Sequence, residues 1–385
     1  MLSRHQKLSK LVLLPLLVLS ATVDAKQSSQ EQTKAEIKLS SSMAYDSNPF
    51  RFSKRLKPSG SEYIETKIRA SYDLNQSFSF EAKLDDKRYG SDTDEANSIK
   101  YTLGTAFVNR FKFLDRKSRF RSKLRWGQFD KTYVSRSTGE IAQWSNEEIG
   151  DRYDYSYWES KNDLSWKYNK QTRLIMNLDH YDKNYQDFSD ATISDLDYSE
   201  TSLGFTWGHK FNKQHKLKAK IEHTLRSYDD YRAHDKGGVD VAGSDLEYRT
   251  WMARLTYSAK LGNSWRLSAI SQIAERKDNA VGYDDSTKTI VRLGVDYHVS
   301  PVSVLKVSVM HTKNDYSSRA AEQNVVDDDQ HEETGFRYRF QYERELQSVK
   351  GLSVISAYRY DDKKSGKADY QHNRSQVSLG LEYKL

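Results

Sequence analysis

Apolar and polar residues alternate one by one along most of this 385-residue chain. Successive side chains of a β-strand point to opposite faces, so alternation at period two predicts strands with one apolar and one polar face. The helical spacing of apolar residues is nearly absent. We count about sixteen alternating segments of roughly ten residues each, which is the length of a tilted strand that crosses an outer membrane.

The connections between these segments alternate between short and long. Gly262-Asn263 and Ser300-Pro301 belong to short connections, whereas residues 130–152, 227–247 and 312–334 belong to long ones. A transmembrane β-barrel has this asymmetry, with short periplasmic turns, long extracellular loops and an even number of strands. A soluble propeller or solenoid would show a sequence motif repeated in every unit, and we find none. The predicted fold is therefore all-β, a transmembrane antiparallel up-and-down barrel of about sixteen strands.

The composition is that of a very polar chain that is nevertheless rich in aromatic residues. Hydrophobic residues make up 36% of the chain and charged residues 30%, yet there are 26 tyrosines, 14 phenylalanines and 7 tryptophans. Disordered chains are poor in aromatic residues, which disfavours disorder. A barrel explains both features, because only alternate residues of its strands face lipid. The chain has no cysteine, which excludes disulfides and thiolate metal sites.

The first residues have the features of a secretory signal peptide. Three cations precede an apolar run, residues 11–23, and Val23-Asp24-Ala25 supplies a cleavage site. We therefore divide the chain into a signal peptide, residues 1–25, and an outer-membrane β-barrel, residues 26–385. Export from the cytoplasm disfavours nucleic acid as a partner. Together with the strand pattern, it predicts location in the bacterial outer membrane.

The stretch RFRSKLRWGQF, residues 119–129, places a cation at every second position from Arg119 to Arg125. On a strand these cations share one face, with Phe120, Leu124 and Trp126 on the other. A barrel of about sixteen strands is wide enough to enclose an aqueous channel, so the polar face is expected to line a lumen. The predicted pore-lining residues are Arg119, Arg121, Lys123, Arg125, Lys218, Lys220, Arg254, Arg292, Arg337, Arg339 and Arg359.

Two interpretations of this basic lumen stay open. Rings of Arg and Lys give a channel a positive potential that favours anionic solutes, and Arg can bind the carboxylate of an acidic sugar through two hydrogen bonds. The same cations can instead pair with carboxylates on neighbouring strands, in which case their net sign has little meaning. Tyr157 either adds a stacking surface for sugar rings or belongs to a loop. We predict a channel for saccharides or other anionic solutes; the alternative is a closed structural barrel that binds other envelope proteins.

Two short segments resemble known bacterial proteins. The C-terminal stretch SLGLEYKL resembles the insertion signal of outer-membrane proteins, and Gly380, Tyr383 and Leu385 match its spacing. Leu385 stands where Phe or Trp is usual. The resemblance implies insertion by the barrel-assembly machinery. AYDSNPFR, residues 44–51, resembles the segment after the first strand of β-barrel porins, some of them linked to surface-polysaccharide systems, and it implies passage of such a polysaccharide.

No residues form a recognised catalytic constellation. His180-Tyr181-Asp182 and His234-Asp235 are the nearest candidates, and neither combines a nucleophile, a base and an orienting residue. The acidic run Asp327-Asp328-Asp329 does not by itself show converging metal ligands. We therefore expect no enzymatic activity, no metal and no other cofactor. The expected partners are outer-membrane lipids, lipopolysaccharide and the solute, and a homo-oligomer is left open.

Overall fold

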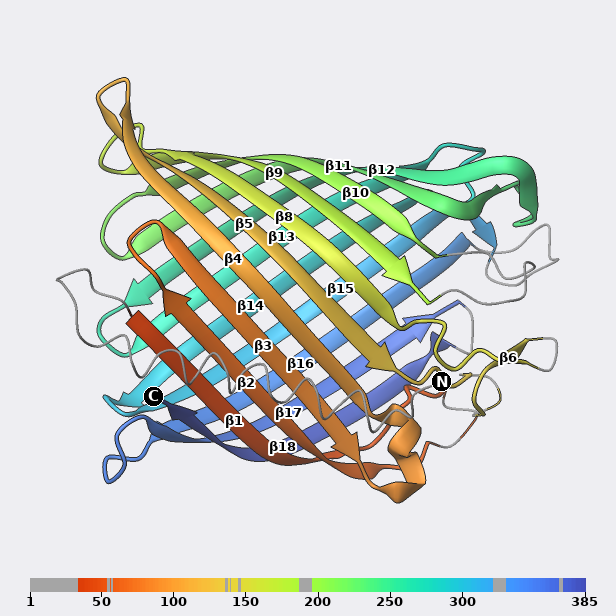
Figure 1. The fold of residues 1–385 in the computed structure, drawn as a ribbon, viewed down its shortest axis with the longest axis horizontal. Coiled ribbons are helices and arrows are strands. Elements are labelled where there is room, and N and C mark those ends of the chain that lie inside the picture. The colour runs from red at the N-terminus through yellow and green to blue at the C-terminus, as the bar shows by residue number, and fades with distance from the viewer. Residues whose placement is uncertain are drawn as a thin grey trace.

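The computed structural model describes residues 34–53, 56, 58–135, 138, 140–144, 147–186, 196–320, 330–366 and 370–385. In this part of the chain sixteen strands form one closed antiparallel barrel, in which each strand pairs with the next along the chain and the first pairs with the last (Figure 1). The predicted barrel architecture is therefore confirmed. The predicted signal peptide, residues 1–25, and the run Asp327-Asp328-Asp329 lie outside the described residues.

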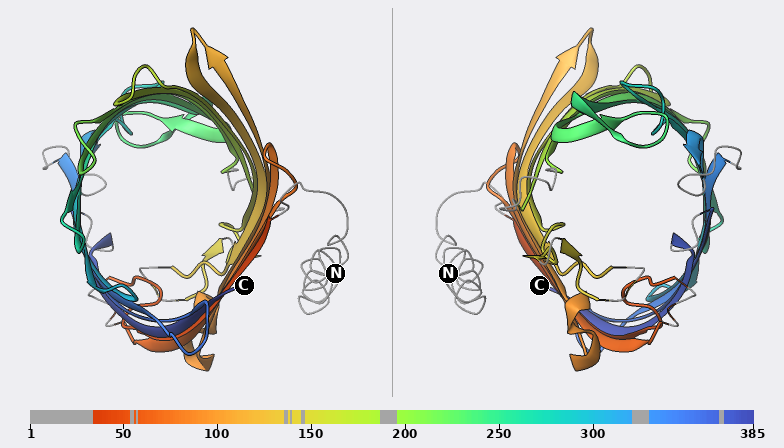
Figure 2. Two further views of the ribbon diagram at one scale, coloured as in Figure 1. Left: turned by 90° about the vertical axis from the view of Figure 1, so that its left-hand side faces the viewer. Right: turned by 90° about the vertical axis from the view of Figure 1, so that its right-hand side faces the viewer.

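The barrel strands are β1 (Lys34–Asp46), β2 (Ser61–Asp73), β3 (Phe78–Tyr89), β4 (Ser98–Phe113), β5 (Arg116–Lys131), β8 (Tyr155–Trp166), β9 (Thr172–Tyr185), β10 (Tyr198–Lys210), β11 (His215–His234), β12 (Asp240–Leu261), β13 (Trp265–Asp278), β14 (Ser286–Ser300), β15 (Ser303–Ala320), β16 (Gln330–Glu345), β17 (Leu352–Ser365) and β18 (His372–Lys384). The described connections also contain a 3-10 helix, η2 (Ser91–Ala96), and a two-stranded sheet of β6 (Gln143–Trp144) and β7 (Glu147–Glu148). Seen from either end the barrel is a ring, and the β6–β7 segment lies within its outline (Figure 2).

The alternation of residue types separates the two faces of the barrel wall. Large apolar side chains are exposed on the outer face, among them Met43, Trp158 and Trp251, with 67%, 51% and 60% of their surface accessible. The residues between them point to the inner side. Lipid offers no hydrogen bonds, so a closed barrel with an apolar outer face is suited to a membrane. Within the described residues, no helix is long and apolar enough to span a membrane.

Two predicted long loops are largely strand, and this part of the prediction was wrong. Residues 227–247 contain the end of β11, the connection 235–239 and the start of β12, while residues 312–334 contain the end of β15 and the start of β16. Beyond the apolar belt both faces of a strand carry polar and aromatic residues, so the alternation fades, although the strands still pair after register shifts. In the first extension Leu246 and Ala233, each with 1% of its surface accessible, form a small buried cluster.

Candidate functional site on the inner wall

The predicted basic strand, β5, pairs part of its cations with carboxylates. Arg125 Nε lies 2.8 Å from Glu81 Oε1, and Arg125 Nη1 lies 2.9 Å from Glu159 Oε2. Lys123 Nζ lies 2.7 Å from Glu81 Oε2. Glu81 belongs to β3, and Gly104 of the intervening strand β4 leaves room for the contact, because a Cβ there would lie 3.0 Å from Glu81 Cγ and 3.1 Å from Arg125 Cγ. Two neighbouring carboxylates thus neutralise part of the basic strip.

All predicted pore-lining residues occupy inward positions, alternating with the exposed apolar residues of their strands. Those with a carboxylate partner are Lys123, Arg125, Lys220, Arg337 and Arg359. Those that make no ion pair within the described part of the chain are Arg119, Arg121, Lys218, Arg254, Arg292 and Arg339. Each interpretation of the basic lumen therefore accounts for some of the cations. That these residues line a conducting pore stays a prediction.

Five tyrosines, one from each of the strands β8 to β12, form a continuous strip that we call the tyrosine ladder: Tyr157, Tyr181, Tyr198, Tyr228 and Tyr248. The rings of Tyr157 and Tyr181 are stacked, with centroids 5.4 Å apart and an interplanar angle of 30°. The strip continues with centroid distances of 6.0 Å to Tyr198, 5.4 Å to Tyr228 and 5.8 Å to Tyr248. All five rings lie at inward positions, so the ladder runs along the inner wall.

Arginine side chains lie over two rings of the tyrosine ladder. The guanidinium carbon of Arg226 is 4.3 Å from the ring centroid of Tyr198, and that of Arg276 is 4.4 Å from the centroid of Tyr248. A cation over a tyrosine face contributes about 0.5–1 kcal/mol at exposed sites. Arg226 also donates hydrogen bonds of 2.9 Å and 2.7 Å from Nε and Nη2 to Glu200. These contacts hold rings and cations in fixed positions.

Sequence reasoning identified only Tyr157 of the tyrosine ladder and left its position open. Tyr157 lies in β8 and not in a loop, has 7% of its surface accessible, and its hydroxyl is 3.0 Å from Thr102 Oγ1. Gly127 makes room for it, because a Cβ at that position would lie 2.5 Å from the Tyr157 ring. Tyr228 was missed because its segment was predicted as a loop. The sequence could have predicted the ladder from tyrosines at inward positions of the alternation, such as those in Tyr155-Ser156-Tyr157.

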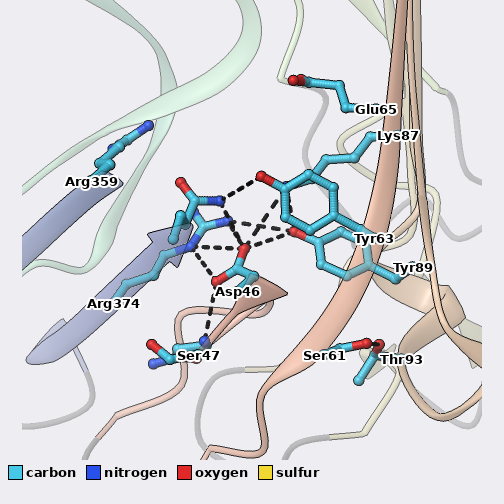
Figure 3. A network of polar contacts seen from close by, with 12 residues as sticks. Asp46, Ser47, Ser61, Tyr63, Glu65, Lys87, Tyr89, Thr93, Arg359 and Arg374 are labelled. Atoms are coloured by element: carbon cyan, nitrogen blue, oxygen red, sulfur yellow. Dashed lines mark hydrogen bonds and ion pairs between the residues drawn. The ribbon is translucent and has the colours of Figure 1, made fainter. Parts of the chain in front are cut away.

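A second polar cluster, the closure network, joins the first strand to the last (Figure 3). Asp46, at the end of β1, is fully buried and accepts a 2.8 Å hydrogen bond from Arg374 Nε of β18. The Tyr89 hydroxyl donates to the same carboxylate at 2.8 Å, and Gln376 Nε2 donates at 2.9 Å. Lys87 Nζ lies 3.8 Å from it. The network therefore stabilises the seam at which the barrel closes.

The segment AYDSNPFR continues from this network, and its polar residues have structural partners. Asn48, with 1% of its surface accessible, accepts a 2.8 Å hydrogen bond from Phe52 N and donates bonds of 2.9 Å to Phe52 O and 3.2 Å to Asn373 O. Ser47 N donates to Ser375 O at 2.9 Å. The segment is thereby fastened to β18. Its link to a polysaccharide stays a prediction.

The histidine nearest to a catalytic arrangement lies on the outer face. His180 Nδ1 is 3.0 Å from Thr201 Oγ1, and its Nε2 is 3.2 Å from Asp182 Oδ2. Hydroxyl, imidazole and carboxylate stand in the order of a hydrolase triad. Acyl transfer also needs donors for the oxyanion, and the backbone of both strands here is engaged in the β9–β10 ladder. His234, the other candidate, lies 3.1 Å from Asp284 Oδ2. We assign no activity to either histidine.

A closed, sixteen-stranded antiparallel barrel with an apolar outer face and a polar inner face is the architecture of outer-membrane β-barrels. This chain is a β-barrel of the outer-membrane type. No family model and no curated protein matches it.

The structure is similar to several solved structures at low sequence identity. OccAB1 of Acinetobacter baumannii is 11% identical with a TM-score of 0.49, and the similarity covers 92% of this chain and 97% of that chain. OmpT, an outer membrane protein of Vibrio cholerae, is 11% identical with a TM-score of 0.48, covering 94% of this chain and 100% of that chain. OccK8 (OprE) of Pseudomonas aeruginosa is 13% identical with a TM-score of 0.46, covering 92% and 98%. The function of this barrel is therefore inferred from its own inner wall.

Proposed function

We propose that this protein is an outer-membrane channel for saccharides or other anionic solutes, among them a surface polysaccharide. The observation that carries the proposal is the inner wall, where the tyrosine ladder and inward cations lie on neighbouring strands of one closed barrel. A barrel of this size encloses a lumen wide enough for solutes. If packed side chains filled the interior instead, the inner face would be expected to carry apolar residues.

Saccharides fit the tyrosine ladder because a sugar ring has both apolar faces and many hydroxyl groups. Tyrosine rings offer flat surfaces for the apolar faces of the sugar, and tyrosine hydroxyls can exchange hydrogen bonds with its hydroxyl groups. The ladder spans five neighbouring strands, so a solute can contact one ring after another. Binding at several weak sites allows a solute to enter and also to leave.

Anionic solutes fit the inward cations that make no ion pair within the described residues, such as Arg121 and Arg292. These side chains would give the lumen a positive potential beyond the part of β5 where Glu81 and Glu159 neutralise Lys123 and Arg125. Anion preference is therefore expected to be moderate, because carboxylates on the same wall offset part of the positive charge.

Conductance across a planar lipid bilayer tests the proposal, and the Glu81→Gln variant tests its electrostatic part. The purified protein is expected to give large, stable and anion-selective currents; no current at any voltage would contradict the channel. Glu81→Gln frees Lys123 and Arg125 from a shared carboxylate, so the reversal potential in a salt gradient should shift toward higher anion selectivity. Asp115→Asn, at the exposed β4–β5 turn, makes the same change of charge away from the wall and should leave the potential unchanged.

We further propose that the barrel-assembly machinery inserts the chain through its C-terminal segment, and that the outer leaflet surrounds it with lipopolysaccharide. Outward positions of β18 support the first point, because Leu379 and Leu381 expose 61% and 52% of their surface. The signal peptide predicted for residues 1–25 would direct export from the cytoplasm. These partners are separate from the solute and do not affect the conductance test.

A further inference from the structure

A recess of about 440 Å³ lies in the inner wall where β8, β9, β10 and β11 run side by side. Small-molecule sites have volumes of about 300–1,000 Å³, so the recess can hold one solute unit. Two successive inward residues of β10, Ser202 and Gly204, are small and leave room at one end of the recess. Ser202 is part of the lining, and a Cβ on the next inward residue, Gly204, would lie 3.2 Å from Lys220 Cε and 3.3 Å from Glu222 Oε2.

Two rings of the tyrosine ladder form one side of the recess. Tyr181 and Tyr198 have centroids 6.0 Å apart and an interplanar angle of 40°, so the two rings are tilted against each other. The rest of the lining is polar. This combination favours a ring-shaped ligand rich in hydroxyl groups over an apolar ligand.

The charges of the recess lining are nearly balanced, with one carboxylate in excess. Its carboxylates are Glu159, Asp179, Glu200 and Glu222, and its cations are Lys161, Lys220 and Arg226, so four negative charges meet three positive ones among the lining residues. Glu159 also lies 2.9 Å from Arg125, which is outside the lining, and Asp179 is therefore the carboxylate without a cation. Every cation is already paired: Lys161 with Glu159 at 2.5 Å, Lys220 with Glu222 at 2.5 Å, and Arg226 with Glu200 at 2.7 Å. Asp179 makes no ion pair within the described residues, and its Oδ1 has no hydrogen-bond partner there.

This charge pattern distinguishes between classes of sugar. A uronate would bring a carboxylate to a lining that already has a negative excess and offers no unpaired cation, which costs free energy. A sugar without an acidic group avoids this repulsion, and its hydroxyls can donate to the lining carboxylates. Metal binding by the carboxylates has no support, because no group of three acidic or histidine side chains in the described residues is arranged to hold an ion.

We propose that this recess is a binding subsite for a pyranose unit that carries no acidic group. The proposal rests on the proposed function, since a saccharide reaches the recess only through the lumen. It also assigns different groups of the solute to different parts of the inner wall. The recess holds uncharged or amino-sugar units, while the inward arginines outside it attract acidic groups.

Block of single-channel current by defined oligosaccharides tests the subsite. The probes are maltohexaose, which is neutral, and hexagalacturonate, which is acidic. In the Ser202→Leu variant the added bulk fills the recess, and the half-blocking concentration of maltohexaose should rise about tenfold, while that of hexagalacturonate stays the same. The matched control is Ser258→Leu, an inward serine of β12 that is not part of the recess, and it should behave as the wild type. The proposal would be overturned if Ser202→Leu left the half-blocking concentration of maltohexaose unchanged. It would also be overturned if the half-blocking concentrations of both oligosaccharides rose equally.

The Asp179→Asn variant tests the charge argument without adding bulk. It removes the excess carboxylate, so hexagalacturonate should block at a several-fold lower concentration, and block by maltohexaose should change little. Unchanged block by hexagalacturonate would show that the charge of the recess does not select the sugar. The two proposals fail in different ways: a wild-type protein without conductance contradicts the channel, whereas a conducting channel with unaltered block contradicts only the subsite.

Discussion

At the level of single residues, the burial of Asp46 is the clearest case in which one side chain fixes several others. Its carboxylate is fully buried and has Arg374, Tyr89 and Gln376 as hydrogen-bond donors. Removing one partner of a buried ion pair leaves the other charge uncompensated in a low-dielectric setting. Asp46 should therefore tolerate substitution less than any of the half-exposed carboxylates of the inner wall.

The Asp46→Asn variant should lower the free energy of unfolding by about 3–5 kcal/mol, because it leaves the buried Arg374 without its carboxylate. Urea unfolding in lipid vesicles, followed by tryptophan fluorescence, measures this difference. Asp73→Asn is the matched control, since Asp73 is exposed at the end of β2 and makes no ion pair within the described residues. Equal unfolding midpoints for the two variants would contradict a stabilising role of the closure network.

At the level of elements, the seam between β1 and β18 depends on a small residue. A Cβ on Gly380 of β18 would lie 2.6 Å from Ser42 Cβ and 2.7 Å from Ser41 O of β1. Gly380 also matches the C-terminal insertion signal in the sequence. The structure thus adds a packing role to a residue that was singled out for recognition by the assembly machinery.

Refolding of purified protein into detergent micelles separates these two roles, because no assembly machinery is present. Gly380→Val should destabilise the closed barrel by about 1–3 kcal/mol and reduce the fraction with the compact, heat-modifiable mobility on gels. Gly335→Val is the control, since the nearest atom to its Cβ would be Asp362 O at 3.7 Å. If Gly380→Val refolds like the control, the glycine serves only as a signal.

At the level of the whole molecule, the two ends of the barrel should lie on opposite sides of the membrane. Short turns such as the β16–β17 connection, residues 346–351, are expected on the periplasmic side, and the β11–β12 hairpin on the outer side. An epitope tag inserted at Gly237 should be labelled by antibody on intact cells. Antibody labelling of a tag between Ser348 and Val349 should stay at background until the cells are permeabilised. The reverse pattern of labelling would contradict the orientation.

The sequence by itself determined the strands and the direction of their side chains. Alternation at period two depends only on local backbone geometry, so it placed residues such as Arg121 and Arg292 on the inward face without knowledge of their neighbours. It also predicted the barrel, since an apolar outer face and an even number of strands suffice for that inference. It failed at the end of β11 and the start of β12, where the alternation fades and backbone pairing defines the strands.

Only the tertiary structure decided which side chains meet. Glu81 neutralises Lys123 and Arg125 because the register of three strands brings them together, and no pattern within one strand contains that register. The tyrosine ladder needs five strands in alignment for the same reason. Asp46 and Arg374 are 328 residues apart in the chain and meet only because the barrel closes. Local geometry thus sets the faces of the wall, while closure and register set its chemistry.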